Sequence, residues 1–210
     1  CAISAATPVH KQNNQKSTCF FISQVFTHAK VEIYCKKTQE KSYFCAQNQP
    51  QRRMKTILLV VGKTVEPHFI TAIADYVQRT KRYLSFDMEV IPELKNTKSL
   101  SEEVQKEKEG ELILKALQPG DVVVLLDEGG KEMRSMEFAD YMKRKMNTVN
   151  KRLVFIIGGP YGFAPKVYEA AHEKMSLSRM TFSHQMVRLI FVEQLYRAMS
   201  ILNGSPYHHE

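Results

Sequence analysis

The 210-residue sequence has no Trp and only four Cys, and its scarce residues are unevenly placed. Residues 1–53 contain no Gly and no Met, whereas residues 54–210 contain no Cys. Because Gly makes up about 7% of average protein sequence, a segment as long as 1–53 should hold about three or four. Two segments of different composition therefore meet at Met54, and we expect the folded domain to be 54–210.

The sequence also lacks long hydrophobic runs. Its longest, at residues 57–61 and 122–126, have the length of a strand and fall far short of the roughly 18 residues of a membrane-spanning helix. Hydrophobic residues make up 43% and charged residues 25% of the chain, which excludes collagen-like, fibrous and disordered classes. We expect no membrane-spanning helix, and one domain with an appendage.

Acidic residues are scarce in 1–53, which holds eight Lys and Arg against two Asp and Glu. Residues 54–210 therefore carry only about +2 of the net charge of +8. We interpret 1–53 as an unstructured leader produced by a mis-set start; a transit peptide and a small basic accessory segment stay open. Its four Cys match no zinc-binding spacing, and we assign them no function.

From Met54 onward, short β-branched runs alternate with segments of helical period. This pattern predicts an α/β fold with a mostly parallel sheet flanked by helices. The predicted strands are 56–61, 86–91, 121–126 and 152–157, with a short strand or extended loop at 176–182. The predicted helices are 67–83, one that begins with a capping box of Ser99 and Glu102, one that is capped by Ser135 and runs through Met146, 165–174 and 184–202. Alternating polarity makes 86–91 an edge strand, whereas 121–126 should be central.

Two of these strands are predicted to end in glycine-bearing loops, DEGGK at 127–131 and GGPYG at 158–162. Ligands bind at the carboxyl ends of strands in open parallel sheets, and glycine lets the backbone approach them closely. We therefore predict a pocket formed by these two sequences. Neither contains a dinucleotide or nucleoside-triphosphate motif, and 54–210 has no metal-binding motif and no nucleophile motif.

Few polar side chains stand out as candidates for chemistry. Arg188 lies in an otherwise apolar helical stretch, where it either extends to the surface or reaches into a pocket. His184 is interpreted as a helix-cap residue, and the adjacent His208 and His209 as a solvated tail. Six basic residues could form local RNA-binding patches or solvated helix faces: Arg79, Lys81, Arg82, Lys143, Arg144 and Lys145.

The order of four motifs closely resembles one family: LLDEGGK, FIIGGPYGF, LSRMTFSHQMVRLIFVEQLYRA and a terminal PYHHE. The family is the ribosomal RNA large subunit methyltransferase H family of SPOUT methyltransferases, and the resemblance covers 54–210 only. It implies a C-terminal trefoil knot, a homodimer and S-adenosylmethionine as cofactor, with no metal. The implied reaction methylates N3 of a pseudouridine in 23S rRNA, on the assembled 70S ribosome.

The resemblance also implies site residues. The cofactor should lie in the knot against Leu126, Gly158, Leu177, Ser178, Arg179, Met180, Thr181 and Phe182. Loss of the N3 proton needs a base or a stabilising donor, for which His208 and Arg188 are candidates, with Tyr207 placing the target base. Two alternatives stay open: a non-catalytic ribosome- or RNA-binding module, and a related knotted tRNA methyltransferase.

Overall fold

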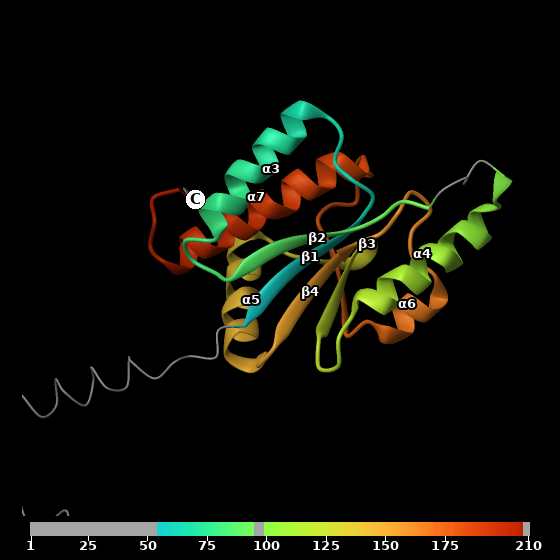
Figure 1. Cartoon of the computed structure of the whole chain (residues 1–210). Helices are drawn as coiled ribbons and strands as arrows, with labels where there is room; N and C mark the ends of the chain where they lie inside the picture. Colours follow the sequence, from blue (N-terminus) through green and yellow to red (C-terminus); the bar gives the residue numbers. More distant parts are fainter. Residues whose placement is uncertain (1–53, 95–98, 208–210) are drawn as a thin grey trace, which may run out of the picture. The chain divides into compact units, whose positions relative to one another are not determined.

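The computed structural model describes residues 54–94 and 99–207 (Figure 1). The predictions made for residues 1–53 and for His208 lie outside this range. The described part is built on one five-stranded sheet in the order β2-β1-β4-β3-β5, in which every neighbouring pair is parallel. The strands are β1 (Lys55–Val61), β2 (Phe86–Ile91), β3 (Val122–Glu132), β4 (Arg152–Ile157) and β5 (Glu173–Ser176).

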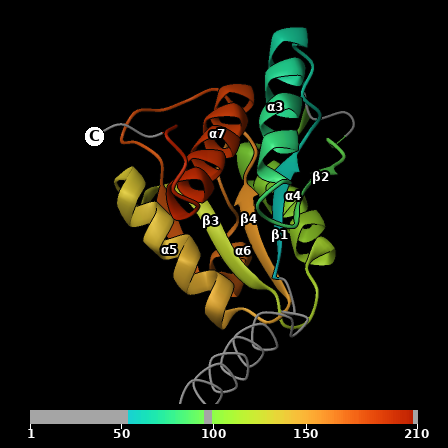
Figure 2. The ribbon, with the colours of Figure 1, turned by 90° about the vertical axis from the view of Figure 1, so that its left-hand side faces the viewer.

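Helices cover both faces of this sheet. They are α3 (Pro67–Thr80), α4 (Glu102–Ala116), α5 (Ser135–Thr148), α6 (Pro165–Ala170) and α7 (His184–Leu202). Helices α3, α5 and α7 pack on one face, whereas α4 and α6 pack on the other (Figures 1 and 2). The predicted parallel α/β architecture is confirmed, with β2 at an edge and β3 inside the sheet.

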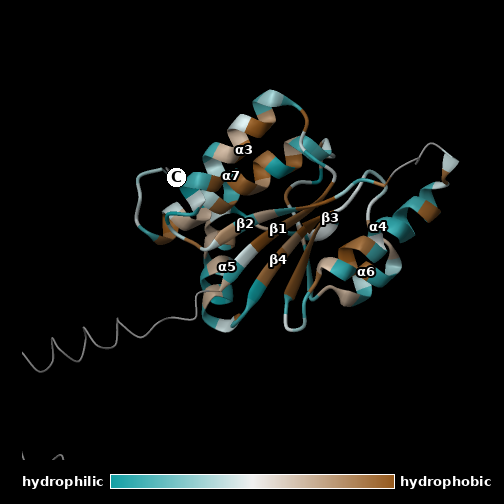
Figure 3. Ribbon diagram, viewed as in Figure 1, coloured by the Kyte–Doolittle hydropathy of each residue, from teal (hydrophilic) through white to brown (hydrophobic). Residues whose placement is uncertain are grey.

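The central strands are apolar on both faces because helices cover both. Leu58 and Phe155 contribute to the core under α7, while Ile57 and Ile156 contribute to the core under α4, and all four side chains are fully buried. Figure 3 shows this pattern as hydrophobic strands between helices whose outer faces are hydrophilic. In the described residues, no helix is long and apolar enough to cross a membrane.

The predicted loop at 127–131 is wrong, because β3 continues through it to Glu132. The extension pairs with β5 after an irregularity between Leu126 and Lys131. A Cβ atom on Gly130 would lie 2.5 Å from the backbone carbonyl carbon of Met175. Glycine is therefore needed here for close packing of two strands.

The predicted helix 165–174 is also too long, since α6 ends at Ala170 and β5 begins at Glu173. The sequence EKMS has no β-branched residue, so pairing with β3 decides its conformation. Three predicted helix caps are wrong as well. The N-cap of α7 is Ser183, which accepts from Met186 N, and His184 is the first residue of the helix. The hydroxyl of Ser101 accepts from Val104 N and caps α4, and Arg134 precedes α5, its backbone N–H donating to Glu137.

Candidate functional site

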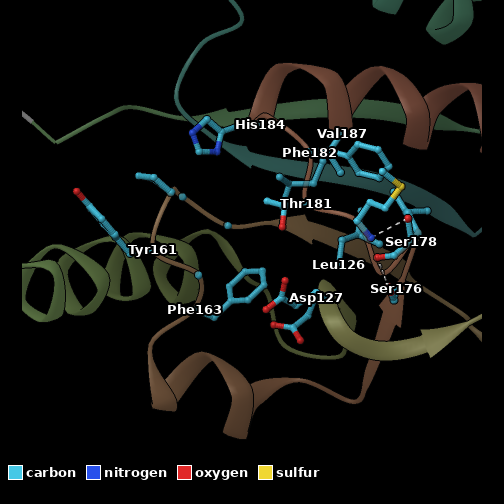
Figure 4. Close-up of a pocket in the computed structure, with 18 of the residues that line it drawn as sticks. Leu126, Asp127, Tyr161, Phe163, Ser176, Ser178, Thr181, Phe182, His184 and Val187 are labelled. Carbon is cyan, nitrogen blue, oxygen red and sulfur yellow. Dashed lines mark hydrogen bonds between the residues drawn. The ribbon is translucent and has the colours of Figure 1, made fainter.

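A cavity of about 600 Å³ lies at the carboxyl ends of β4 and β5, beside the middle of β3 where its pairing with β5 becomes irregular. The middle of β3, the glycine sequence after β4 and the segment from β5 to α7 form its walls (Figure 4). Parallel strands bring these three chain segments together although they are far apart in the sequence. The predicted pocket is thus present at the expected edge of the sheet.

Seven of the eight residues predicted to contact a cofactor line this cavity: Leu126, Gly158, Leu177, Ser178, Met180, Thr181 and Phe182. The exception is Arg179. Its side chain is 87% exposed and pairs with Glu132 on β3, with 3.2 Å between Nε and Oε2. The side chain of Arg179 therefore extends away from the cavity that its neighbours line.

The glycine sequence after β4 gives the cavity a wall of bare backbone. A Cβ atom on Gly158 would lie 3.0 Å from the ring of Phe163, closer than most side chains tolerate. Gly162 has a φ of 82°, a conformation that favours glycine, and its N–H donates to Gly159 O at 3.2 Å. The turn is therefore specified by its glycines, and it leaves peptide groups facing the cavity.

Two serines shape the opposite wall. The Ser176 hydroxyl donates to the carbonyl oxygen of Ser178 at 2.9 Å, and the Ser178 hydroxyl accepts from Met180 N at 2.9 Å (Figure 4). Such local bonds fold a segment into tight turns without regular secondary structure. Both hydroxyls are thus bonded within the segment. Leu177 and Phe182 of the same segment supply apolar surface to the cavity.

One acidic residue of the cavity is held in a fixed orientation. Asp127 accepts from the Tyr168 hydroxyl at 2.6 Å and from Gly129 N at 2.9 Å. Burial, together with this bond, raises the pKa of Tyr168 to about 12, so the phenol remains a donor at neutral pH. Neither side chain is among the predicted site residues, although an Asp directly after a predicted buried strand is a signal for such a site.

Arg188 does not line this cavity, and it does not extend to the surface. It is 2% exposed, and it donates to Val61 O at 2.6 Å and to the Thr64 hydroxyl at 3.0 Å. Burial lowers the pKa of its guanidinium, and the charge of Glu93 opposes that effect. Arg188 therefore joins α7 to the segment after β1, and it lines a second cavity beside the first.

Tyr207 lies against the later turns of α7, and it lines neither cavity. Its hydroxyl is 3.3 Å from that of Tyr76 and donates to Glu193 at 3.2 Å, while Arg197 lies 4.9 Å from the centre of its ring. Burial, followed by the bond with Tyr76, raises the pKa of Tyr207. Within one chain, the described catalytic candidates Arg188 and Tyr207 are therefore not brought together.

Comparison with known proteins identifies the fold and its family. Residues 54–208 match the family model described as predicted SPOUT methyltransferase. The chain belongs to the SPOUT methyltransferases. Among them it is 82% identical over 157 residues to the ribosomal RNA large subunit methyltransferase H of Bacteroides thetaiotaomicron. It is 55% identical over 157 residues to the protein of the same name from Porphyromonas gingivalis. Each match covers 75% of this chain and 100% of the relative.

Proposed function

We propose that this SPOUT methyltransferase transfers a methyl group from S-adenosylmethionine to N3 of a pseudouridine in the RNA of the large ribosomal subunit. The observation that carries the proposal is the cavity of about 600 Å³ at the carboxyl ends of β4 and β5, beside the middle of β3. The names of the closely similar relatives support large-subunit RNA as the substrate.

The residues of the cavity fit S-adenosylmethionine. Bare backbone at Gly158 suits the edge and face of an adenine, and apolar contacts are available from Leu126 and Leu177. Asp127 and Glu128 line the cavity together with one basic residue, Lys106, so the negative charge is in excess there and favours a cationic ligand. When bound, the cofactor supplies an electrophilic methyl group on a positively charged sulfur.

Methyl transfer of this kind needs correct placement more than a covalent intermediate with the enzyme. The hydrogen bonds of Asp127 to Tyr168 and of Ser176 to Ser178 fix both walls of the cavity before any ligand arrives. A preformed site avoids the entropy loss of ordering its walls on binding. These residues would hold and orient the methyl donor, and the apolar contacts would exclude water.

The N3 proton of the target must leave, so a base is needed within hydrogen-bond reach. We assign this task to the C-terminal tail, with His208 as the base and Tyr207 as a contact for the target. Tyr207 follows α7 in the chain and packs against Glu193 in the middle of that helix. The cavity is lined instead by His184 and Val187 in the first turn of α7. The tail of a second copy would therefore complete the site, which supports a homodimer.

The proposal includes a trefoil knot in the C-terminal part, for which membership of the SPOUT family is the support. It also includes the cytoplasm as the location and the assembled 70S ribosome as the substrate. The net charge of about +2 on residues 54–210 is small for a protein that captures free RNA. A preformed ribosomal surface requires a smaller basic field.

The test is methyl transfer from labelled S-adenosylmethionine by the full chain to three substrates: assembled ribosomes, isolated rRNA and tRNA. Nucleoside analysis after digestion identifies the product. We expect 3-methylpseudouridine in large-subunit RNA, formed fastest on ribosomes. Product in tRNA would instead support a knotted tRNA methyltransferase. Ribosome binding without methyl transfer would support a non-catalytic module.

A further inference from the structure

A second cavity of about 270 Å³ lies on the other side of the Gly159–Pro160 segment. Its walls come from the end of β1 and the segment after it, the segment after β2, α4 and the first turns of α7. The residues that line it include Lys63, Val65, Glu93, Glu109, His184 and Arg188. None of the features that identified the first cavity in the sequence indicates this one.

Two buried charged side chains face this cavity, and each has an atom without a partner. Glu109 is 5% exposed; its Oε1 accepts from Gln105 at 2.8 Å, but its Oε2 has no hydrogen bond among the described residues. Arg188 is 2% exposed, and its Nε is likewise unbonded within the described part of the chain. Leaving such groups unpaired is costly, so unpaired atoms in a native site require an explanation.

Only the backbone at Gly159 separates the Glu109 carboxylate from the first cavity. Its Oε2 lies directly beneath Gly159, where a Cβ atom would collide with it. The cover is thus the backbone of the glycine sequence, which also forms a wall of the first cavity. A small shift of that backbone would give a ligand access to the carboxylate, and any residue larger than glycine would prevent the close contact.

Charge and size together restrict what the cavity can hold. Lys63 and Arg188 oppose Glu93 and Glu109, so the formal charges of these four residues cancel. With the four charges cancelling, the cavity has little net electrostatic attraction for a phosphate or a cation. A neutral ring with both donors and acceptors can instead form hydrogen bonds with a carboxylate and a guanidinium at the same time. The volume falls just below the roughly 300–1,000 Å³ of drug-sized ligand pockets. It suits one nucleobase rather than an oligonucleotide.

The two cavities share Gly159, Pro160 and His184. A ligand in the second cavity would therefore lie beside a methyl donor in the first. We propose that the second cavity receives the target nucleobase, with the carboxylate of Glu109 accepting from one edge and the guanidinium of Arg188 donating to another. His184, exposed at the start of α7, lies where the base would meet the donor. This inference rests on the proposed function.

The test uses a variant that blocks the second cavity without disturbing the core. Val65 is 65% exposed at its rim, so Val65→Trp should fold normally and fill the opening. The matched control is Val104→Trp, since Val104 is 43% exposed on α4 and lines neither cavity. Glu109→Gln keeps the shape of the buried side chain, removes its charge and replaces one acceptor oxygen by an NH2 donor.

Three quantities are measured on full-length proteins. They are the affinity for S-adenosylmethionine by calorimetry, the KM for ribosomes, and the binding of the nucleoside pseudouridine by NMR in the presence of S-adenosylhomocysteine. For Val65→Trp we expect unchanged cofactor affinity, a KM raised roughly tenfold or more, and loss of nucleoside binding. Glu109→Gln should weaken nucleoside binding roughly tenfold, because an amide can present a donor where an acceptor is needed. Val104→Trp should match the wild type.

Three results would overturn the inference. The first is wild-type protein that binds the cofactor but no nucleoside, and the second is Val65→Trp that binds nucleoside as the wild type does. The third is loss of cofactor binding in Val65→Trp, since the second cavity would then belong to the cofactor site. Failure of the proposed function appears differently. Nucleoside binding that Val65→Trp abolishes, in a protein that methylates no large-subunit RNA, would support the base site and reject the proposed reaction.

Discussion

The two cavities beside the Gly159–Pro160 segment differ in the chemical groups that line them. Backbone and apolar side chains dominate the first, where Gly158 removes a side chain and Leu177 adds a hydrophobic contact. Buried charges dominate the second, where Glu109 and Arg188 each keep an unbonded atom among the described residues. A wall of backbone accepts a ligand by shape and peptide hydrogen bonds, whereas a wall of buried charges selects for complementary polar edges. The difference suggests that donor and target are recognised in separate places.

The largest expected effect comes from a segment that belongs to neither cavity. Deleting residues 207–210 removes Tyr207 and the proposed base, and should lower the rate of methyl transfer roughly 10²–10⁴-fold. Affinity for S-adenosylmethionine should stay within about twofold, because Tyr207 does not line the first cavity. Single-turnover kinetics and calorimetry measure the two quantities. A parallel loss of both would place the tail in the cofactor site.

The second prediction compares two arginines. Arg188→Met removes two hydrogen bonds from a buried guanidinium and should lower the free energy of unfolding by about 3 kcal/mol. Arg179→Met is the matched control; because that side chain is 87% exposed, the change should cost less than about 0.5 kcal/mol and leave cofactor affinity unaltered. Urea titration measures stability. Equal losses in both variants would contradict the burial argument.

A smaller effect is expected within the first cavity. Tyr168→Phe removes the 2.6 Å hydrogen bond to Asp127 and frees its carboxylate to rotate. Affinity for S-adenosylmethionine should fall by about 1 kcal/mol, or roughly fivefold. Tyr161→Phe is the control, since the Tyr161 hydroxyl shows no hydrogen bond in the described residues although it lines the same cavity. If both changes weaken binding alike, the orientation of Asp127 does not matter.

The smallest effect lies outside both cavities. Hydrogen bonds from Lys81, at 2.9 Å, and from Lys55 lower the pKa of Asp87. Because the folded pKa is below the unfolded one, the stabilisation is present above the unfolded pKa of about 3.9 and is lost as pH falls through the folded value. Asp87→Asn should cost less than about 1 kcal/mol near neutral pH, since the pairs are exposed. Urea titrations measure the free energy of unfolding of both proteins. The difference between the wild type and Asp87→Asn should be present at neutral pH and should disappear at acidic pH.

The features that the sequence predicts well are those that depend on local pattern. Helix α7 begins at His184 and ends at Leu202 as predicted, because Ser183 caps it and its apolar residues continue throughout. The position of the first cavity follows from two glycine sequences after buried strands. Seven of its expected residues come from the family resemblance, and without that resemblance the segment after β5 would have had no clear signal.

The features that could not be predicted depend on contacts between distant segments. β5 forms because its short sequence pairs with β3, and the extension of β3 past Asp127 depends on the same pairing. Arg188 is buried because it reaches Val61 and Thr64, more than a hundred residues earlier. The second cavity needs α4, α7 and the segments after β1 and β2 together. No periodicity or motif encodes such an arrangement.

The most direct test of the account is a calorimetric titration of S-adenosylmethionine into the full chain and two variants. Gly158→Leu places a side chain in the first cavity against Phe163, whereas Val104→Leu places the same side chain at an exposed position that lines neither cavity. We expect saturable binding by the wild type and by Val104→Leu, and an affinity lower by roughly a hundredfold or more in Gly158→Leu. Equal affinity in all three folded proteins would show that the methyl donor binds elsewhere.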